Sequence, residues 1–178
     1  MIRLRHALTA LVIPAILVGQ TPRAAAPVAA SYRGFAPGSS YREFAERART
    51  LASRDTLRCN TSRNSAQLME CGVMIRDPQD SARFYLSSYV LEGKIAMVSL
   101  VDSGGPRLVE WARRDMSKRF GPSQRRERSM MEWKTGRRVV RLNWRGRGNA
   151  RWISITLRDD DVMDGIARYV PRTPARHK

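Results

Sequence analysis

The stretch RRVVRLNWRGRGNARWISITLR, residues 137–158, decides the fold because two segments of alternating apolar residues flank a Gly-rich loop. In the second segment Ile153, Ile155 and Leu157 fall on one face of a strand, and Trp152 falls on the other. The first segment alternates in the same way, and the loop between them predicts that the two strands pair antiparallel. One face of each strand is apolar, so the sequence predicts an antiparallel sheet with one buried face.

A helix and a further strand precede this stretch. Residues 123–133 continue the strand pattern up to a Thr-Gly turn. Before them, apolar side chains recur every four residues from Leu108 to Phe120, after a proline at position 106 that suits a first helical turn. Gly121 and the proline after it end this helix. The second half therefore predicts a helix and then a three-stranded meander, with strands over about 123–133, 137–144 and 151–158.

Residues 39–103 predict the same order of elements. Ser40 and Glu43 have the spacing of a capping box, and apolar residues then recur at helical intervals over residues 41–53. After the second half, Asp159-Asp160-Asp161 begins a short last helix. The strands predicted after the first helix span residues 57–60, 67–75, 83–91 and 94–101.

We therefore predict a single α+β domain over residues 39–170. Its antiparallel sheet has six to seven strands, two main helices pack on one face of the sheet, and a short helix lies near the C-terminus. The helix–strands–helix–strands order suggests a degenerate internal duplication at the level of architecture. Gly and Pro in residues 31–38 predict a flexible N-terminal arm, and residues 171–178 predict a disordered basic tail.

The first thirty residues predict a signal peptide. Arg3 and Arg5 form a basic start, an apolar run follows over residues 7–19, and Val28 and Ala30 supply small residues at a cleavage site. We expect cleavage after Ala30 and a secreted or periplasmic protein. The apolar run is shorter than the ~20 residues of a membrane-spanning helix, and no later window approaches that length, so we predict no membrane span.

The two cysteines of the chain, Cys59 and Cys71, are expected to form a disulfide in an oxidising compartment. The two histidines, His6 and His177, lie in the predicted leader and tail. The predicted domain therefore holds no imidazole that could activate a thiol or a serine. The sequence also lacks the common catalytic motifs, and we predict a non-enzymatic protein without a cofactor.

Carboxylates leave one enzymatic alternative open, since a glycosidase needs two of them across a cleft. The cluster of Asp159 to Asp161 with Asp164 offers calcium ligands, but its spacing differs from that of an EF-hand loop. Carboxylates at a helix start cap free amides, so we predict capping there and no metal site. The candidate glycosidase carboxylates, which the sequence does not pair, are Glu70, Glu92, Glu110, Glu127 and Glu132.

The formal charge of +17 is unevenly distributed along the chain. Residues 104–158 carry 16 basic and 4 acidic side chains, whereas residues 31–103 carry 10 and 8. A segment with so few compensating acids favours an anionic partner. Two explanations of its arginines stay open, namely a functional basic surface and the codon usage of a GC-rich genome.

The three-stranded meander gathers the candidate binding residues. Alternation places Arg141, Trp152 and Arg158 on the face opposite the predicted core, and arginines of the first strand and of the Gly-rich loop extend this surface. Cations around an aromatic ring can hold an acidic macromolecule. In the alternative, Trp152 covers a second layer and the arginines face solvent. The candidate residues are Arg126, Arg128, Arg141, Arg147, Trp152 and Arg158.

Several motifs of residues 104–158 resemble those of small periplasmic domains. They are Phe120-Gly121-Pro122, Met131-Glu132-Trp133, Val139-Val140-Arg141-Leu142 and Trp152-Ile153-Ser154-Ile155-Thr156-Leu157. Their order is similar to that of the β-lactamase-inhibitor-protein-like fold and of the SmpA/OmlA-type outer-membrane assembly lipoproteins. The resemblance implies helices on one face of an antiparallel sheet and a non-enzymatic binding or assembly function. No lipidation cysteine lies near the predicted cleavage site, and we carry over no functional residue.

Our leading hypothesis is a secreted, non-catalytic binding domain that contacts an anionic envelope glycolipid or an acidic protein through its basic meander. Nucleic acid is a less favoured partner, because glycolipids and acidic proteins are the common polyanions outside the cytoplasm. The first alternative is an inhibitor or envelope-assembly partner that recognises a protein by shape. The second alternative is the hydrolase with a carboxylate pair.

Overall fold

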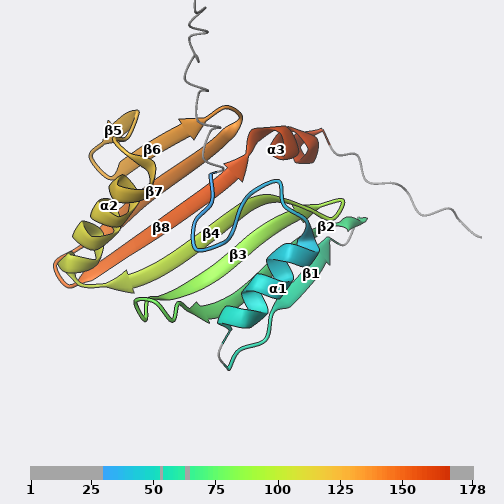
Figure 1. Cartoon of the computed structure of the whole chain (residues 1–178), viewed down its shortest axis with the longest axis horizontal. Coiled ribbons are helices and arrows are strands. Elements are labelled where there is room, and N and C mark those ends of the chain that lie inside the picture. Colours follow the sequence, from blue (N-terminus) through green and yellow to red (C-terminus); the bar gives the residue numbers. More distant parts are fainter. Residues whose placement is uncertain (1–29, 53, 63–64, 169–178) are drawn as a thin grey trace, which may run out of the picture.

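The computed structural model describes residues 30–52, 54–62 and 65–168, which form one antiparallel sheet and three helices (Figure 1). The predicted leader, up to residue 29, and the predicted tail lie outside the described residues. The elements in chain order are α1 (Tyr41–Leu51), β1 (Arg58–Ser62), β2 (Ser65–Arg76), β3 (Arg83–Leu91), β4 (Lys94–Gly104), α2 (Pro106–Phe120), β5 (Arg125–Glu127), β6 (Met130–Thr135), β7 (Arg138–Arg147), β8 (Ala150–Asp159) and α3 (Asp160–Ala167).

The sheet of the described residues has eight strands in the order β1-β2-β3-β4-β8-β7-β6-β5. Each half of the chain contributes one helix and then four strands that pair in sequence order. The two halves meet where β4 pairs antiparallel with β8. The centre of the sheet is therefore built from the last strand of each half, where the buried side chains of Leu100 and Ile155 lie opposite each other.

The prediction of six to seven strands is wrong, because residues 123–133 form two strands rather than one. The chain reverses at Arg128 and Ser129, so that β5 pairs antiparallel with β6. No Gly, Pro or Asn marks this turn, which removes the usual sequence signal for a reversal. All three residues of β5 are exposed, and charged side chains on such a short edge strand discourage pairing with another chain.

Both long helices lie on the same side of the sheet (Figure 1). Helix α1 begins at a capping box in which the Ser40 side chain accepts from the Glu43 amide and the Glu43 carboxylate accepts from the Ser40 amide. Its buried residues include Phe44 and Ala48, and those of α2 are Ala112 and Met116. Alternate residues of the strands supply the opposing half of this core.

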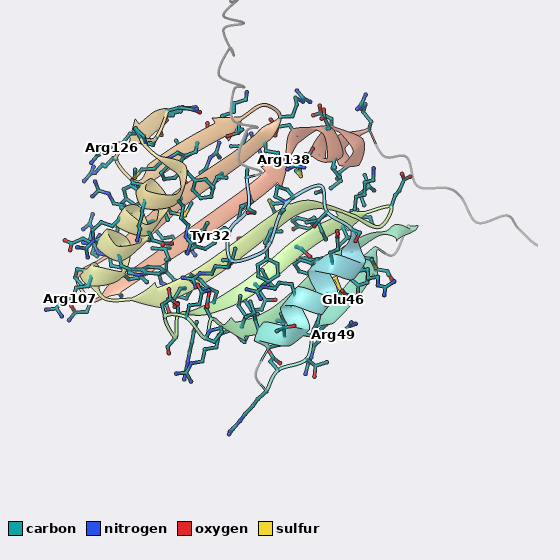
Figure 2. All side chains as sticks on the ribbon, viewed as in Figure 1. Tyr32, Glu46, Arg49, Arg107, Arg126 and Arg138 are labelled. Atoms are coloured by element: carbon teal, nitrogen blue, oxygen red, sulfur yellow. A yellow bond between two sulfur atoms is a disulfide. The ribbon has the colours of Figure 1, made fainter. Side chains whose placement is uncertain are left out.

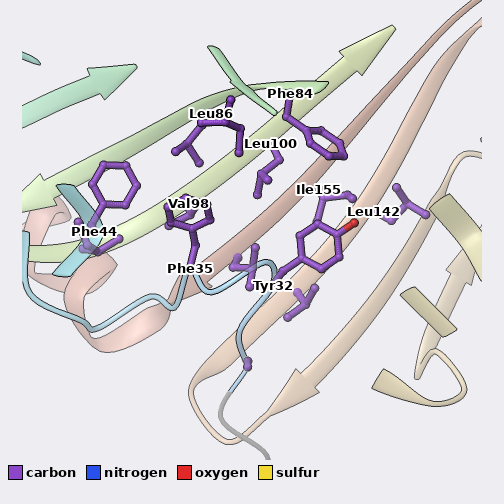
Figure 3. Packing of buried hydrophobic residues seen from close by; sticks show 14 of the residues in the cluster. Tyr32, Phe35, Phe44, Phe84, Leu86, Val98, Leu100, Leu142 and Ile155 are labelled. Atoms are coloured by element: carbon purple, nitrogen blue, oxygen red, sulfur yellow. The ribbon is translucent and has the colours of Figure 1, made fainter. Parts of the chain in front are cut away.

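Residues 30–38 fill the space between the two helices (Figure 3). The side chains of Tyr32 and Phe35 are fully buried, and they join one cluster with Val98 and Leu100 of β4. The Gly and Pro content of residues 31–38 predicts a flexible arm, and the structure instead packs this segment into the core. The prediction fails because large aromatic side chains gain more from burial than Gly and Pro cost in chain entropy.

The buried guanidinium of Arg33 fixes this segment to the turn between β2 and β3. The Arg33 side chain forms an ion pair with Asp77 and a second one, at 2.7 Å, with Asp80. Its Cζ atom lies 4.9 Å from the ring centre of Phe84 and 5.7 Å from that of Trp111. A buried cation needs paired carboxylates and aromatic faces of this kind, so Arg33 ties residues 30–38 to the turn between β2 and β3.

The predicted disulfide is confirmed. Cys59 of β1 lies directly opposite Cys71 of β2, and their sulfur atoms are bonded at 2.09 Å. A disulfide fits an extracellular or periplasmic location, where thiols oxidise. None of the helices in the described part of the chain combines the length and the apolarity that a membrane crossing requires.

Replacement of both cysteines by serine is expected to lower the free energy of unfolding by about 3 kcal/mol, because the bridge closes a short loop in the unfolded chain. The cysteines are 12 positions apart in sequence. Urea denaturation followed by tryptophan fluorescence measures this change, with the exposed β1 substitution Thr61→Ser as the control. A double serine variant as stable as the control would contradict a stabilising bridge.

Candidate functional site

The face of the sheet opposite α1 and α2, here called the open face, carries the exposed apolar side chains of the described residues. Strand pairing aligns Met74 with Tyr85, and it puts Tyr89 and Trp152 on the same side. These four side chains have exposed fractions between 38 and 49 %. Aromatic residues and methionine are enriched at protein binding surfaces, so the open face is a candidate contact surface.

Hydroxyl groups occupy the middle of the open face. Ser87, Ser99 and Thr156 lie in one row across β3, β4 and β8. The Ser154 hydroxyl lies 3.4 Å from that of Ser99 and 3.5 Å from that of Thr156. This polar strip separates the apolar side chains of β2 and β3 from Trp152 on β8.

The structure places Arg141, Trp152 and Arg158 on the open face but does not gather them. Arg158 and Trp152 lie about 20 Å apart along β8, at ~3.3 Å per residue. The Arg141 Nε atom donates to Glu132 at 2.8 Å, and the Arg158 Nε atom lies 2.9 Å from an Asp160 carboxylate oxygen. Both guanidinium charges are therefore neutralised by neighbouring carboxylates.

The other predicted cations occupy different parts of the molecule. Arg126 of β5 pairs with Met131, whose side chain is buried on the helix side of the sheet, so Arg126 also faces that side (Figure 2). Arg128 lies in the turn between β5 and β6, and Arg147 lies at the end of β7. Alternation predicts that these arginines form one continuous basic surface. In the structure they lie on both faces of the sheet, in a turn and in a hairpin.

A denser group of cations, here called the hairpin end, lies where α2 begins next to the β7–β8 hairpin. Gly104, two residues before α2, pairs with Arg151, and Arg151 pairs with Gly146 across the hairpin. Figure 2 shows Arg107 at this end of the molecule. The hairpin end consists of Arg107, Arg113 and Arg114 of α2 and of Arg145, Arg147 and Arg151 of the hairpin.

No ion pair within the described residues involves any arginine of the hairpin end. Two carboxylates of α2 lie near these arginines in sequence: Glu110 lies between Arg107 and Arg114, and Asp115, which follows Arg114, pairs with Arg119. Six like charges close together repel one another and lower the stability of the free protein, so an anion at this end is favourable.

Two tryptophans flank the base of the hairpin. The Arg113 guanidinium lies 5.7 Å from the ring centre of Trp144, and the Arg145 guanidinium lies 5.9 Å from that of Trp152. Trp152 also borders a hollow of about 340 Å³ on the open face. The hairpin end thus combines cations with an exposed indole ring, which offers both charge and apolar area to a partner.

Two of the five candidate glycosidase carboxylates, Glu127 and Glu132, and the aspartates at the start of α3 are held by basic or backbone groups. Arg125 pairs with Glu127 at 2.6 Å, next to the pair of Arg141 with Glu132. The Asp159 side chain accepts from the amides of Asp161 and Val162 and thereby caps α3. The remaining aspartates of this cluster include two that pair with Arg137, namely Asp161 and Asp164.

The sequence contains every cation of the hairpin end, but not their proximity. Arg113-Arg114 on a helix and Arg145-Gly146-Arg147-Gly148 in a loop each look like ordinary solvated charge. Their meeting depends on the pairing of β4 with β8, a contact between the two halves of the chain. Local periodicity carries no information on such a contact.

Comparison of the chain with protein families, with curated proteins and with solved structures finds no match.

Proposed function

We propose that this chain is a non-catalytic binding domain for an anionic macromolecule, and that the hairpin end is its contact surface. The observation that carries the proposal is the convergence of six arginines from two distant segments without a paired carboxylate among the described residues. An acidic glycolipid or an acidic protein would supply the compensating charge.

The distribution of ion pairs separates this proposal from codon usage alone. Arg119, Arg137, Arg138 and Arg141 each face a carboxylate within 3.4 Å. Six of the eight other arginines in residues 104–158 have such a partner among the described residues, whereas none of the six at the hairpin end does. The hairpin end therefore replaces the middle of the meander as the expected binding surface.

Salt-dependent retention tests the proposal. The protein is passed over heparin, lipopolysaccharide and single-stranded DNA supports along a sodium chloride gradient. We expect retention on the first two at low salt, and Arg145→Ala with Arg147→Ala is expected to elute at lower salt than the wild type. Because both side chains are exposed, this variant is expected to unfold at the same temperature as the wild type.

Arg49→Ala with Arg168→Ala is the matched control, since it removes the same charge from exposed positions of α1 and the end of α3 (Figure 2). Elution of both double variants at the same salt concentration would show that only total charge matters. That result, or no retention of the wild type at low salt, would contradict the proposal.

Recognition of a protein by shape is the second candidate, and the open face favours it. The exposed side chains of Met74, Tyr85, Tyr89 and Trp152 form apolar area of the kind found in protein interfaces. The resemblance of residues 104–158 implies a non-enzymatic binding or assembly function, and this candidate is one form of it. Co-purification of one envelope protein that persists in high salt and is lost in Tyr85→Ser would favour this candidate over the first.

A further inference from the structure

A second group of unpaired cations lies on the open face, in the half of the sheet formed by β1 to β4, which does not contain the β7–β8 hairpin. Arg54, Arg76 and Arg83 line a hollow of about 810 Å³ together with Asp55 and Met74. Among the residues that the structure describes, no ion pair involves any of the three arginines. The nearly balanced charge of residues 31–103 conceals this group, because the acids nearest to it have other partners: Asp77 and Asp80 pair with Arg33, and Asp55 accepts from two backbone amides.

Two of the three cations directly oppose each other. Arg76 is the last residue of β2 and Arg83 is the first of β3, and the two are register partners. Side chains of directly opposed residues have Cβ atoms ~5 Å apart, and like charges at such positions destabilise the pairing of strands. Both side chains are exposed and point to the open face, as does Tyr85, two residues after Arg83.

Asp55 also lines the hollow. Its carboxylate accepts from the amide of Met74 at 2.8 Å and from that of Thr56 at 2.9 Å. These hydrogen bonds lower the pKa of Asp55, so the group is ionised and holds the loop after α1 against β2. The loop thereby brings Arg54 to the hollow that Arg76 and Arg83 line.

From this geometry we infer that the hollow binds a phosphate ester, with the phosphate held by Arg76, Arg83 and Arg54. A guanidinium matches two phosphate oxygens at once, and a phosphate monoester carries up to two negative charges that relieve the repulsion between Arg76 and Arg83. Three guanidinium groups outnumber the one carboxylate of Asp55, so the net charge of the hollow is positive. The exposed side chains of Met74 and Tyr85 lie beside the hollow and offer apolar contact to the organic part of the ligand.

The inference goes beyond the proposed function and does not depend on it, because it uses a different surface. The hairpin end lies on β7, β8 and α2, whereas this hollow lies on β2, β3 and the loop after α1. Variants of one surface therefore leave the side chains of the other unchanged, so that failure of one proposal is distinguishable from failure of the other.

The test measures the melting temperature of the protein in inorganic phosphate and in sodium chloride of equal ionic strength, followed by calorimetric titration with inorganic phosphate. We expect phosphate to raise the melting temperature of the wild type above its value in chloride. Arg76→Gln with Arg83→Gln is expected to lose this increase and to bind phosphate at least about tenfold more weakly. Arg49→Gln with Arg168→Gln, which removes the same charge from exposed positions outside both surfaces, is the matched control and is expected to retain the full increase.

A second measurement excludes a merely structural effect of the substitutions. Without phosphate and at low salt, Arg76→Gln is expected to melt at a higher temperature than the wild type, since it removes a like-charge pair. If phosphate and chloride act equally on the wild type, or if the Arg76→Gln with Arg83→Gln variant keeps the phosphate-dependent increase, the inference is overturned.

Vesicles distinguish two sources of the phosphate ester. Sedimentation with vesicles that contain phosphatidic acid, but not with phosphatidylcholine alone, would assign the site to a lipid headgroup. Binding of inorganic phosphate without binding to either vesicle would assign it to a water-soluble ester. In either case, Arg76→Gln with Arg83→Gln must lose the binding that the wild type shows. A wild type that binds neither inorganic phosphate nor vesicles with phosphatidic acid contradicts the inference.

Discussion

Phe35→Ala is expected to lower the free energy of unfolding by about 3–5 kcal/mol, the range found when a buried phenylalanine is truncated in a well-packed core. The Phe35 ring is fully buried, and its centre lies 5.5 Å from that of Phe44 in α1. Its removal leaves a cavity between the two helices that neighbouring side chains cannot close without moving both. Chemical denaturation followed by circular dichroism measures the effect.

Tyr89→Ala is the matched control for this prediction, because it removes an aromatic ring of similar size from the open face. The Tyr89 side chain is partly exposed, and its removal is expected to cost less than about 1.5 kcal/mol. Equal effects of the two substitutions would show that residues 30–38 are a loose arm, as their composition predicts, and not part of the core.

Asp77→Asn is expected to cost about 3–5 kcal/mol, because it leaves the buried Arg33 guanidinium without its fully buried counter-ion. The side chains of Arg33 and Asp77 are 1 % and 4 % exposed. The Asp77 side chain accepts a hydrogen bond from the Gln79 amide at 2.9 Å. Asparagine keeps an oxygen for this bond, so the turn itself is preserved. Equilibrium unfolding in urea measures the loss.

Asp80→Asn is the control, and it is expected to have a smaller effect because the Asp80 side chain is 38 % exposed. Arg33→Met combined with Asp77→Asn is expected to be more stable than Asp77→Asn alone, since no unpaired charge remains buried. A double variant that is less stable than the single variant would contradict this account of the Arg33 cluster.

The Arg33 cluster also predicts how stability responds to acid. Hydrogen bonds from Arg33 are the largest cause of a lowered pKa of Asp80 in the folded protein. The stabilisation from this carboxylate is therefore complete above its unfolded pKa of about 4 and is lost as the pH falls through the lower folded value. Asp80→Asn is expected to reduce the slope of unfolding free energy against pH below about pH 4.

The sequence predicts elements whose signal is local. The capping box of Ser40 with Glu43, the stripe of α2 and the alternation of β8 all concern residues within a few positions of one another. The pairing of Cys59 with Cys71 is also local, because the two residues lie on strands that are adjacent in sequence. Elements that lack a local signal are predicted poorly, and the unmarked turn at Arg128 is the example.

The candidate site depends on contacts that local patterns do not encode. The pairing of β4 with β8 brings α2 to the hairpin, and the turn at Arg128 moves Arg126 to the helix side of the sheet. Ion pairs then decide which cations are available, since Glu132 neutralises Arg141 while Arg145 has no such partner among the described residues. Alternation predicts the face of a residue and gives no information on its counter-ion.

The affinity of the protein for heparin, measured as a function of sodium chloride concentration, tests the proposed anionic binding most directly. The account predicts that the logarithm of the binding constant falls linearly with the logarithm of salt concentration for the wild type. It predicts a shallower slope for Arg145→Ala with Arg147→Ala, and the wild-type slope, within error, for Arg49→Ala with Arg168→Ala. A wild-type affinity that does not change with salt, or identical slopes for the two double variants, would contradict the claim that the hairpin end binds the anionic partner.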